Sequence, residues 1–118
     1  MANDFKRICT PSIGTSLTTI YAVPAGPSSA ALESIVIGIT MANKTTSGVT
    51  ASIFIDNEDG SNDVYIVKEA TIPAGSALEV MSGNKLVLMN DGSNADNLEA
   101  LASSTSAVDV TVSVLEDV

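Results

Sequence analysis

The sequence predicts an all-β fold: a single antiparallel β-sandwich, of jelly-roll or immunoglobulin-like type, with about eight short strands. Three observations predict it. The hydrophobic residues are nearly all aliphatic, with two Phe, two Tyr and no Trp, a composition that suits pleated sheets. Short apolar runs recur at spacings of about 8–12 residues with turn residues between them. Two corners of nearly the same sequence, VPAG at 23–26 and IPAG at 72–75, each separate two such runs.

The chain of 118 residues is predicted to be one β-sandwich domain over residues 1–118, because chains of this length typically form a single domain. A chain of this size buries roughly 65–70% of its unfolded surface, which suffices for a core without disulfides or metal. Residues 1–10 are assigned either to a docking arm or to an edge strand of the sandwich.

The first part of the chain alternates strands with polar turns. Residues 4–9 are predicted to be a short strand or an arm, and 10–16 a loop, because that segment is rich in Ser, Thr, Pro and Gly. β-branched residues predict a strand at 16–23. The prolines and glycine of 24–29 then end this strand, since proline fixes the backbone and removes a hydrogen-bond donor.

The longest apolar segment, 30–42, is predicted to be a central strand rather than a helix, because its Ile residues alternate with other residues. An extended backbone places Ile35, Ile37 and Ile39 on one face of this strand. The alternating segment 49–55 follows a polar loop. We expect these two strands to pair as a hairpin.

The second half of the chain continues the same pattern of strands and turns. Segments 77–81 and 85–89 are predicted to pair through a tight turn at 82–84, and 96–101 is either a short strand or one helical turn. Strict alternation of Val with other residues predicts the last strand. The segments of this half that are predicted as strands without an alternative are 64–68, 77–81, 85–89 and 107–115.

Charge and hydropathy exclude two classes of partner. The chain has 14 acidic and 5 basic residues, a net charge of −9, and such a chain is repelled by nucleic acid. No basic face is visible, so no nucleic-acid partner is expected. No apolar run is long enough to span a bilayer, and the N-terminus carries no secretory signal, so no membrane partner is expected.

The residue types argue against catalysis. The chain has no His, which is the commonest general acid or base. The letters SGNK at 82–85 match a Ser-x-x-Lys pattern, but its companion motifs are missing. We therefore predict that the chain is not an enzyme and needs no cofactor. The single Cys9 forms no intramolecular disulfide, fits assembly in a reducing cytoplasm, and is expected to be a small buried hydrophobe.

Two polar loops are candidates for binding a calcium ion, because oxygen-rich loops bind hard cations. The first holds the candidate metal ligands Asp56, Glu58, Asp59 and Asp63. Its spacing does not match an EF-hand loop, and the alternative is that these are ordinary solvated turn residues. The second loop holds Asp91, Ser93 and Asp96, with the same alternative.

The remaining candidate activity is association with other proteins. The candidate partner-binding residues are Asp4, Phe5, Lys6, Arg7 and Ile8. This segment holds a basic pair and a Phe in an acidic chain that has few aromatic residues, so it is a candidate docking arm. The alternative is that Phe5 and Ile8 complete the core while Lys6 and Arg7 face water.

Seven stretches carry a resemblance to a known protein class. They are MANDFKR at 1–7, TIYAVPA at 19–25, SIVIGITMAN at 34–43, DVYIVK at 63–68, IPAGSALEV at 72–80, KLVL at 85–88 and VDVTVSVLE at 108–116. In these the chain resembles small β-sandwich virion structural proteins of tailed bacteriophages, of the type found in phages of marine bacteria and cyanobacteria. The resemblance spans most of the chain and brings no catalytic residues with it.

The resemblance implies a non-enzymatic virion protein assembled in the host cytoplasm. A net charge of −9 does not suit a DNA-filled interior, so we expect a capsid decoration (cement) protein that binds the outer surface of capsid subunits. Its expected partners are the major capsid protein or other virion proteins, and copies of itself in a homo-oligomer such as a trimer. The alternative is a neck, tail or fibre module for host attachment, assisted by calcium.

Overall fold

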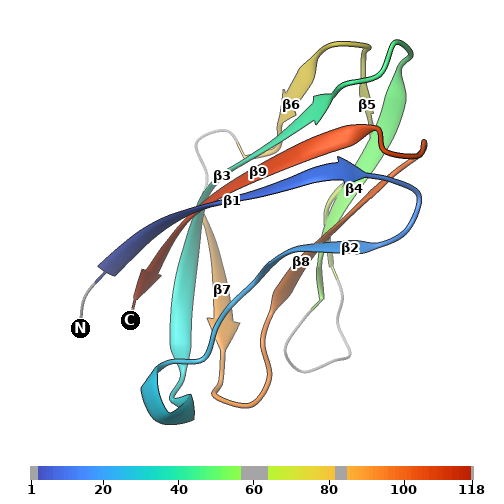
Figure 1. Cartoon of the computed structure of the whole chain (residues 1–118). Helices are drawn as coiled ribbons and strands as arrows, with labels where there is room; N and C mark the ends of the chain where they lie inside the picture. Colours follow the sequence, from blue (N-terminus) through green and yellow to red (C-terminus); the bar gives the residue numbers. More distant parts are fainter. Residues whose placement is uncertain (1–2, 57–63, 82–84, 118) are drawn as a thin grey trace.

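The computed structural model describes residues 3–56, 64–81 and 85–117. These residues form two antiparallel sheets and one short 3-10 helix, Pro27–Ser29 (Figure 1). The strands are β1 (Asn3–Ile13), β2 (Thr18–Ala22), β3 (Leu32–Asn43), β4 (Val49–Asp56), β5 (Val64–Ile72), β6 (Ala77–Glu79), β7 (Leu86–Asn90), β8 (Asn97–Ala102) and β9 (Val108–Asp117). Sheet A has the order β1-β9-β3, with β6 and β7 both pairing to β3 beyond it, and sheet B has the order β2-β8-β4-β5.

The strand order identifies the sandwich as a jelly roll. Most connections carry the chain from one sheet to the other, so β1 lies in sheet A, β2 in sheet B and β3 in sheet A again. In an immunoglobulin-like sandwich the first two strands would be neighbours in one sheet, whereas here β1 pairs with the last strand, β9. The two ends of the chain therefore lie side by side, with Asn3 opposite Asp117 (Figure 1).

The expected all-β sandwich is confirmed, but both expected hairpins are wrong. β3 and β4 lie in different sheets, and β6 and β7 do not pair with each other. Instead, β7 pairs with the first half of β3 and β6 with its last residues, so these two strands share one edge of β3. The alternation of a strand specifies which side is buried, but not which strand lies next to it.

Several strand boundaries also differ from those expected. β1 continues through residues 10–13, which were expected to be loop, with a register shift against β9 between Thr10 and Ile13. The ambiguous segment 96–101 is the strand β8, and β5 extends beyond 68 to Ile72. These differences arise because sheet neighbours supply hydrogen bonds that hold residues of low strand propensity in the ladder.

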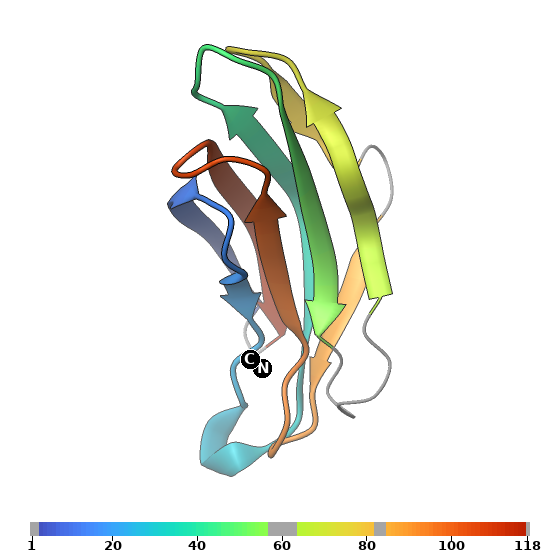
Figure 2. The same ribbon diagram turned by 90° about the vertical axis from the view of Figure 1, so that its right-hand side faces the viewer.

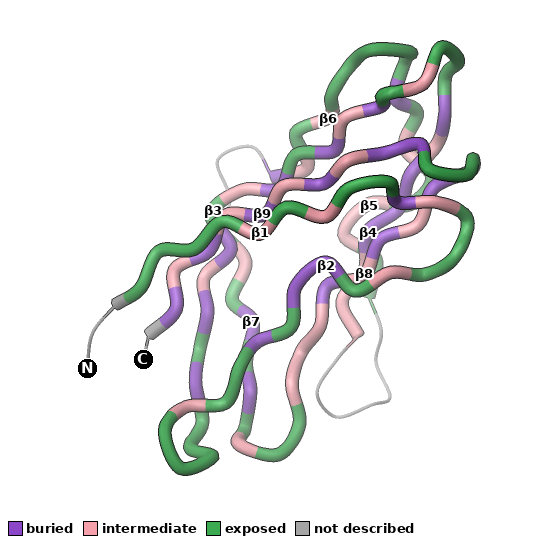
Figure 3. Tube along the Cα trace, in the orientation of Figure 1, coloured by how far each residue is buried: buried purple, intermediate pink, exposed green. Residues whose placement is uncertain are grey.

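The core lies between the two sheets and is almost wholly aliphatic. Figure 2 looks onto sheet B with sheet A behind it, and Figure 3 shows buried positions alternating with exposed ones along the strands. Alternate residues of β4 and of β9 are buried, as the alternation of these segments predicts, although Ser52 of β4 is buried as well and Ile55 only partly. The buried alternate residues are Val49, Ala51, Ile53, Val108, Val110, Val112 and Val114.

Two buried asparagines hold the two Pro-Ala-Gly corners. Asn90 donates from Nδ2 to the carbonyl oxygen of Val23 at 2.8 Å, and Asn43 donates from Nδ2 to the carbonyl oxygen of Ile72 at 2.9 Å. Val23 and Ile72 each immediately precede the proline of a corner. Because a buried carbonyl must find a donor, the same solution occurs at both corners.

The two corners occupy comparable places in the fold but have different backbones. Each leads the chain out of sheet B and into sheet A, after β2 and after β5. Gly75 has a φ of 69°, in the left-handed region that favours glycine, whereas Gly26 has a φ of −73° and precedes the 3-10 helix. The shared sequence therefore marks a shared topological position and not one turn type.

Candidate functional site

An apolar row crosses the outer face of sheet A from edge to edge. Phe5 of β1 lies opposite Leu115 of β9, Leu115 opposite Ile35 of β3, and Ile35 opposite Val87 of β7. Phe5 and Val87 are 74% and 56% exposed, and the two central residues are partly exposed. We call these four residues the apolar row. It is a candidate protein-binding surface, because solvent-facing apolar side chains in contiguous register indicate an interaction site.

A β-bulge in β3 lies next to the apolar row. The register against β9 shifts between Val36 and Gly38, so the buried positions change from Val36 on one side of the bulge to Ile39 on the other. Ile37, at the bulge, is 43% exposed. The expectation that Ile35, Ile37 and Ile39 share a face is therefore wrong, because the extra residue reverses the alternation. The row itself depends on the pairing of β1, β9, β3 and β7, which alternation along single strands does not show.

The surroundings of the row add apolar area and two opposite charges. Met89, two residues beyond Val87 on β7, is 45% exposed. Arg7 and Glu33 are exposed next to the row on β1 and β3. Burying a side chain such as Phe5 or Val87 is worth about 1.5–3 kcal/mol. A partner that covers the whole row would therefore gain several favourable contacts at once.

The candidate partner-binding residues at 4–8 all belong to β1, which pairs with β9 in unbroken register from Asn3 to Thr10. Strand alternation places Phe5 and Arg7 on the outer face of sheet A and the other three on the side toward sheet B. Of those three, Ile8 packs against the core, and Lys6 lies 3.9 Å from Asp4. The structure thus divides the segment between two surfaces and brings Phe5 into the apolar row.

A buried carboxylate fastens β1 to the rest of the domain. Glu116 of β9 is 1% exposed. Its Oε1 lies 2.9 Å from Lys6 Nζ, and its Oε2 accepts a 2.6 Å hydrogen bond from the Tyr21 hydroxyl. The Tyr21 hydroxyl also lies 2.7 Å from the buried Ser34 hydroxyl. We call Lys6, Glu116, Tyr21 and Ser34 the carboxylate network, and it joins β1, β9, β2 and β3.

The carboxylate network alters the proton affinity of two of its members. The hydrogen bond and charge of Glu116 raise the pKa of the Lys6 ammonium above its ordinary value. Burial, followed by the hydrogen bond to Glu116, raises the pKa of the Tyr21 phenol. Both shifts favour the protonated forms of Lys6 and Tyr21, which are the forms that donate hydrogen bonds to Glu116.

A groove of about 390 Å³ runs between the edges of β1 and β2. Its walls include Ile8, Ile20 and Pro24, with Lys6 and Glu116 among the residues that line it. The charge of Glu116 is already neutralised by Lys6. The groove therefore presents mainly apolar wall and backbone edges to a partner.

The calcium candidates find little support among the described residues. Glu58, Asp59 and Asp63 lie outside the residues that the structure describes, and Asp56 is at the end of β4. Within 3–56, 64–81 and 85–117 no group of three or more His, Cys, Asp or Glu side chains is arranged to hold a metal ion.

The second loop uses its acidic residues to shape its own turn. Asp91 Oδ1 accepts hydrogen bonds from the backbone N–H groups of Asn94 at 2.7 Å and Ser93 at 2.8 Å. These two bonds, that of Asn94 first, lower the pKa of Asp91. Asp96 Oδ2 accepts a bond from Met89 N–H at 2.9 Å. This geometry agrees with the alternative of turn residues.

Cys9 is exposed on β1, so the expectation that it is buried is wrong. Strand alternation continues the outward positions of Phe5 and Arg7 to this residue. One face of an edge strand such as β1 packs on the core. The residues on its other face are exposed to solvent, whatever their type.

Comparisons with known proteins support the fold alone. No protein-family model and no curated protein matches the chain. A chain of the infectious bursal disease virus particle matches with a TM-score of 0.51 and 12% identity over 97% of this chain and 30% of its own length. A chain from the disulfide-linked pili of Bacillus endospore appendages matches with a TM-score of 0.44 and 12% identity over 97% of this chain and 86% of its own.

The likeness to the viral chain shows that this sandwich recurs inside a larger protein, since the present chain spans 30% of that chain's length. At 12% identity it carries no site residues across. The described residues include no helix with the length and apolar character needed to cross a membrane.

Proposed function

We propose that the chain is a non-enzymatic structural protein of a virus particle, and more narrowly a capsid decoration (cement) protein that binds the outer surface of capsid subunits. The observation that carries this proposal is the apolar row, which runs across β1, β9, β3 and β7 on the outer face of sheet A. A broad, flat contact of this kind suits binding across neighbouring subunits better than binding a small substrate.

Two further observations support the particle surface as the place of binding. The resemblance inferred from the sequence implies a small phage virion protein, and the fold is shared with part of a chain from a virus particle. The net charge of −9 favours a partner whose apolar contact is ringed by Lys and Arg side chains, because such a rim complements an acidic protein. The packaged nucleic acid would instead repel the chain.

The location and assembly follow from this proposal. The protein would be assembled in the host cytoplasm and would sit on the finished virion, with the major capsid protein as its principal partner. Self-association into a homo-oligomer, such as a trimer, would place several apolar rows on one symmetric capsid site.

Counting copies in purified virions tests the role. Quantitative mass spectrometry against the major capsid protein should give a simple fraction of the capsid count. A handful of copies per particle would assign the protein to the neck or tail, and its absence from virions would overturn the structural role.

Substitution of the row tests the surface. The double variant Phe5→Ser/Val87→Ser should lose at least tenfold in affinity for capsids that lack the protein, because it removes two apolar anchors worth about 1.5–3 kcal/mol each. Sedimentation of the protein with such capsids measures the loss, and circular dichroism checks the fold.

The matched control is Leu17→Ser/Val64→Ser, since these residues are 55% and 54% exposed but lie outside sheet A. If this control lost binding while the row variant kept it, the apolar row would not be the docking surface. Deleting residues 1–8 is a weaker test, since it removes most of the paired length of β1 as well as Phe5.

A further inference from the structure

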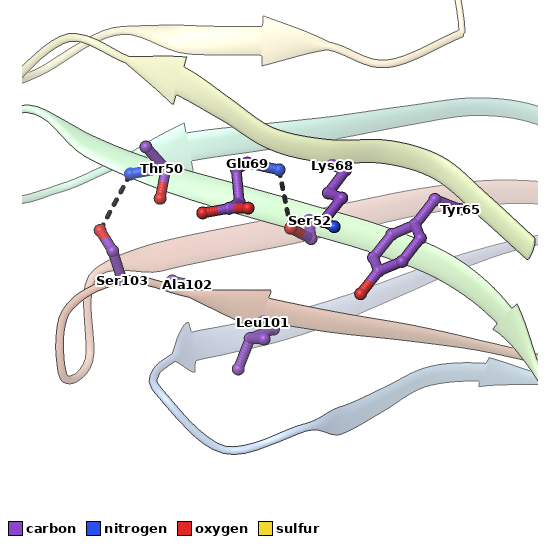
Figure 4. Close-up of a pocket in the computed structure, with 8 residues that line it drawn as sticks. All are labelled: Thr50, Ser52, Tyr65, Lys68, Glu69, Leu101, Ala102 and Ser103. Atoms are coloured by element: carbon purple, nitrogen blue, oxygen red, sulfur yellow. Dashed lines mark hydrogen bonds between the residues drawn. The ribbon is translucent and has the colours of Figure 1, made fainter.

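A shallow depression of about 200 Å³ lies on the outer face of sheet B, across β5, β4 and β8 (Figure 4). Residues of all three strands line it, among them Thr50, Ser52, Tyr65, Lys68, Glu69 and Leu101. The depression is on the opposite side of the sandwich from the apolar row. Its volume is below the roughly 300–1,000 Å³ of pockets for drug-sized ligands, so any ligand it holds is small.

An irregular backbone in β5 shapes this depression. Glu69 has a φ of 50°, in the left-handed region that non-glycine residues rarely adopt. The register between β4 and β5 shifts next to it, between Ala51 and Ile53. As a result the Glu69 N–H donates to the hydroxyl of the buried Ser52 at 2.8 Å. Backbone strain of this kind concentrates at binding sites.

Hydroxyl groups form the polar part of the lining. Ser103 accepts a hydrogen bond from the Thr50 N–H at 2.9 Å (Figure 4), as Ser52 does from Glu69. These bonds fix the positions of both hydroxyl oxygens. A hydroxyl that accepts one bond keeps its own hydrogen to donate and a second lone pair, so both groups retain capacity for a ligand.

The other side chains supply an apolar plate and two charges. Tyr65 is 52% exposed, and its ring centroid lies 5.6 Å from that of Phe54. Lys68 Nζ lies over the face of the Tyr65 ring, 5.3 Å from its centroid, and Leu101 adds an aliphatic surface. The carboxylate of Glu69 lies between Thr50 and Ser52, with Lys68 between it and Tyr65 (Figure 4). One site thus combines an aromatic face, a charged acceptor, a charged donor and hydroxyls.

We propose that this depression binds one monosaccharide unit of a glycan. A sugar ring offers C–H groups that can pack on Leu101 and against the exposed part of Tyr65, and hydroxyls that both donate to Glu69 and accept from Lys68. A simple anion such as phosphate suits the site less, because the Glu69 carboxylate would repel it. If the apolar row docks on a capsid, as proposed above, sheet B faces outward and presents the depression to glycans outside the particle.

Titration with sugars tests the site directly on the full chain. Methyl glycosides of glucose, galactose, mannose and N-acetylglucosamine are added separately to the ¹⁵N-labelled protein, with inorganic phosphate as the ion control. We expect saturable shifts of the amides of Thr50, Ser52, Lys68 and Leu101 with at least one sugar, at a millimolar dissociation constant. The absence of saturable shifts for every sugar would overturn the proposal, as would equal shifts with phosphate.

Two variants and a control locate the binding. Glu69→Gln removes a charged hydrogen bond and Tyr65→Ala removes the ring contact. Each variant should therefore weaken sugar binding by about tenfold. Glu79→Gln, an exposed carboxylate on β6 of sheet A, should leave it unchanged. Sugar binding that survives both site variants would place the ligand elsewhere and refute the assignment. Capsid binding of the same variants is measured separately, so failure of the sugar site and failure of the docking surface are distinguishable.

Discussion

At the scale of single residues, the most consequential group is the carboxylate of Glu116. A buried charge is tolerated only where it is paired and hydrogen-bonded. Lys6 and Tyr21 meet that need from two different strands. Glu116 therefore ties β1 to the sandwich through side chains as well as through the backbone ladder, next to the strand position that carries Phe5.

Replacing Lys6 should destabilise the fold more than replacing another lysine of similar exposure. We expect Lys6→Met to lower the free energy of unfolding by about 1–2 kcal/mol, because it leaves the Glu116 charge without its cation, although the exposed Lys6 end reduces the effect. The double variant Lys6→Met/Glu116→Gln should recover part of this loss. Urea unfolding of the unsubstituted protein, the two single variants and the double variant measures the coupling energy between Lys6 and Glu116. Lys85→Met is the control for the loss of one positive charge.

The pH dependence of this contribution has a definite sign. The pKa of Lys6 is raised in the folded state. Its stabilising effect is therefore complete below the unfolded value of about 10.4 and is lost as the pH rises through the higher folded value. The difference in stability between the natural chain and Lys6→Met should shrink in that alkaline range. A difference that grew there would contradict the ion pair.

At the scale of elements, alternation predicted the inner faces of β4 and β9 correctly because both strands keep one phase over the buried stretch. It failed for β3, where the bulge between Val36 and Gly38 reverses the phase. Alternation could not reveal partner strands either, since pairing depends on distant segments. The row of Phe5, Leu115, Ile35 and Val87 depends on the pairing of four strands that are distant in sequence, which is why Phe5 alone of its members was a candidate.

The turn after β7 offers an element-scale prediction. Gly92 has a φ of 100°, and an added Cβ would lie 2.3 Å from the carbonyl oxygen of Ser29 in the 3-10 helix. Gly92→Ala should therefore lower the free energy of unfolding by about 2–4 kcal/mol, through backbone strain and a clash between two connections. Thermal or urea unfolding measures it.

Gly48→Ala is the matched control for this variant. The heavy atom nearest to a Cβ at Gly48 is 3.9 Å away, so we expect a change of no more than about 1 kcal/mol, in the stabilising direction. Equal destabilisation by both substitutions would mean that loss of glycine, and not the approach of the two connections, is responsible.

At the scale of the whole molecule, the jelly roll is built from pairs of strands that are remote in sequence. β1 pairs with β9, and β2 with β8, so much of each sheet must wait for nearly the whole chain to be ordered. Such topologies fold slowly because the entropy of closing long loops is lost before the stabilising contacts between distant strands form. The two faces of the finished sandwich are then rigidly opposed, with the apolar row on one and the polar depression on the other.

Refolding should accordingly take milliseconds to seconds after a jump out of urea. Stopped-flow tyrosine fluorescence measures this, since Tyr21 is buried at 6% exposure and reports on the closed sandwich. Complete refolding within microseconds would show that local contacts, and not the pairing of distant strands, dominate the transition state.

The adjacency of Asn3 and Asp117 on β1 and β9 also determines how the protein answers a pulling force. Asn3 and Asp117 form the pair at one end of the β1–β9 ladder. Tension between the two termini would therefore separate the strands from that end, breaking one residue pair after another. Force-extension measurements through the termini should therefore find peeling at low force, whereas force applied across the sheets, as between two capsid subunits held by one face, would be shared by many bonds. The sandwich should therefore resist tension across its strands more strongly than tension between Asn3 and Asp117.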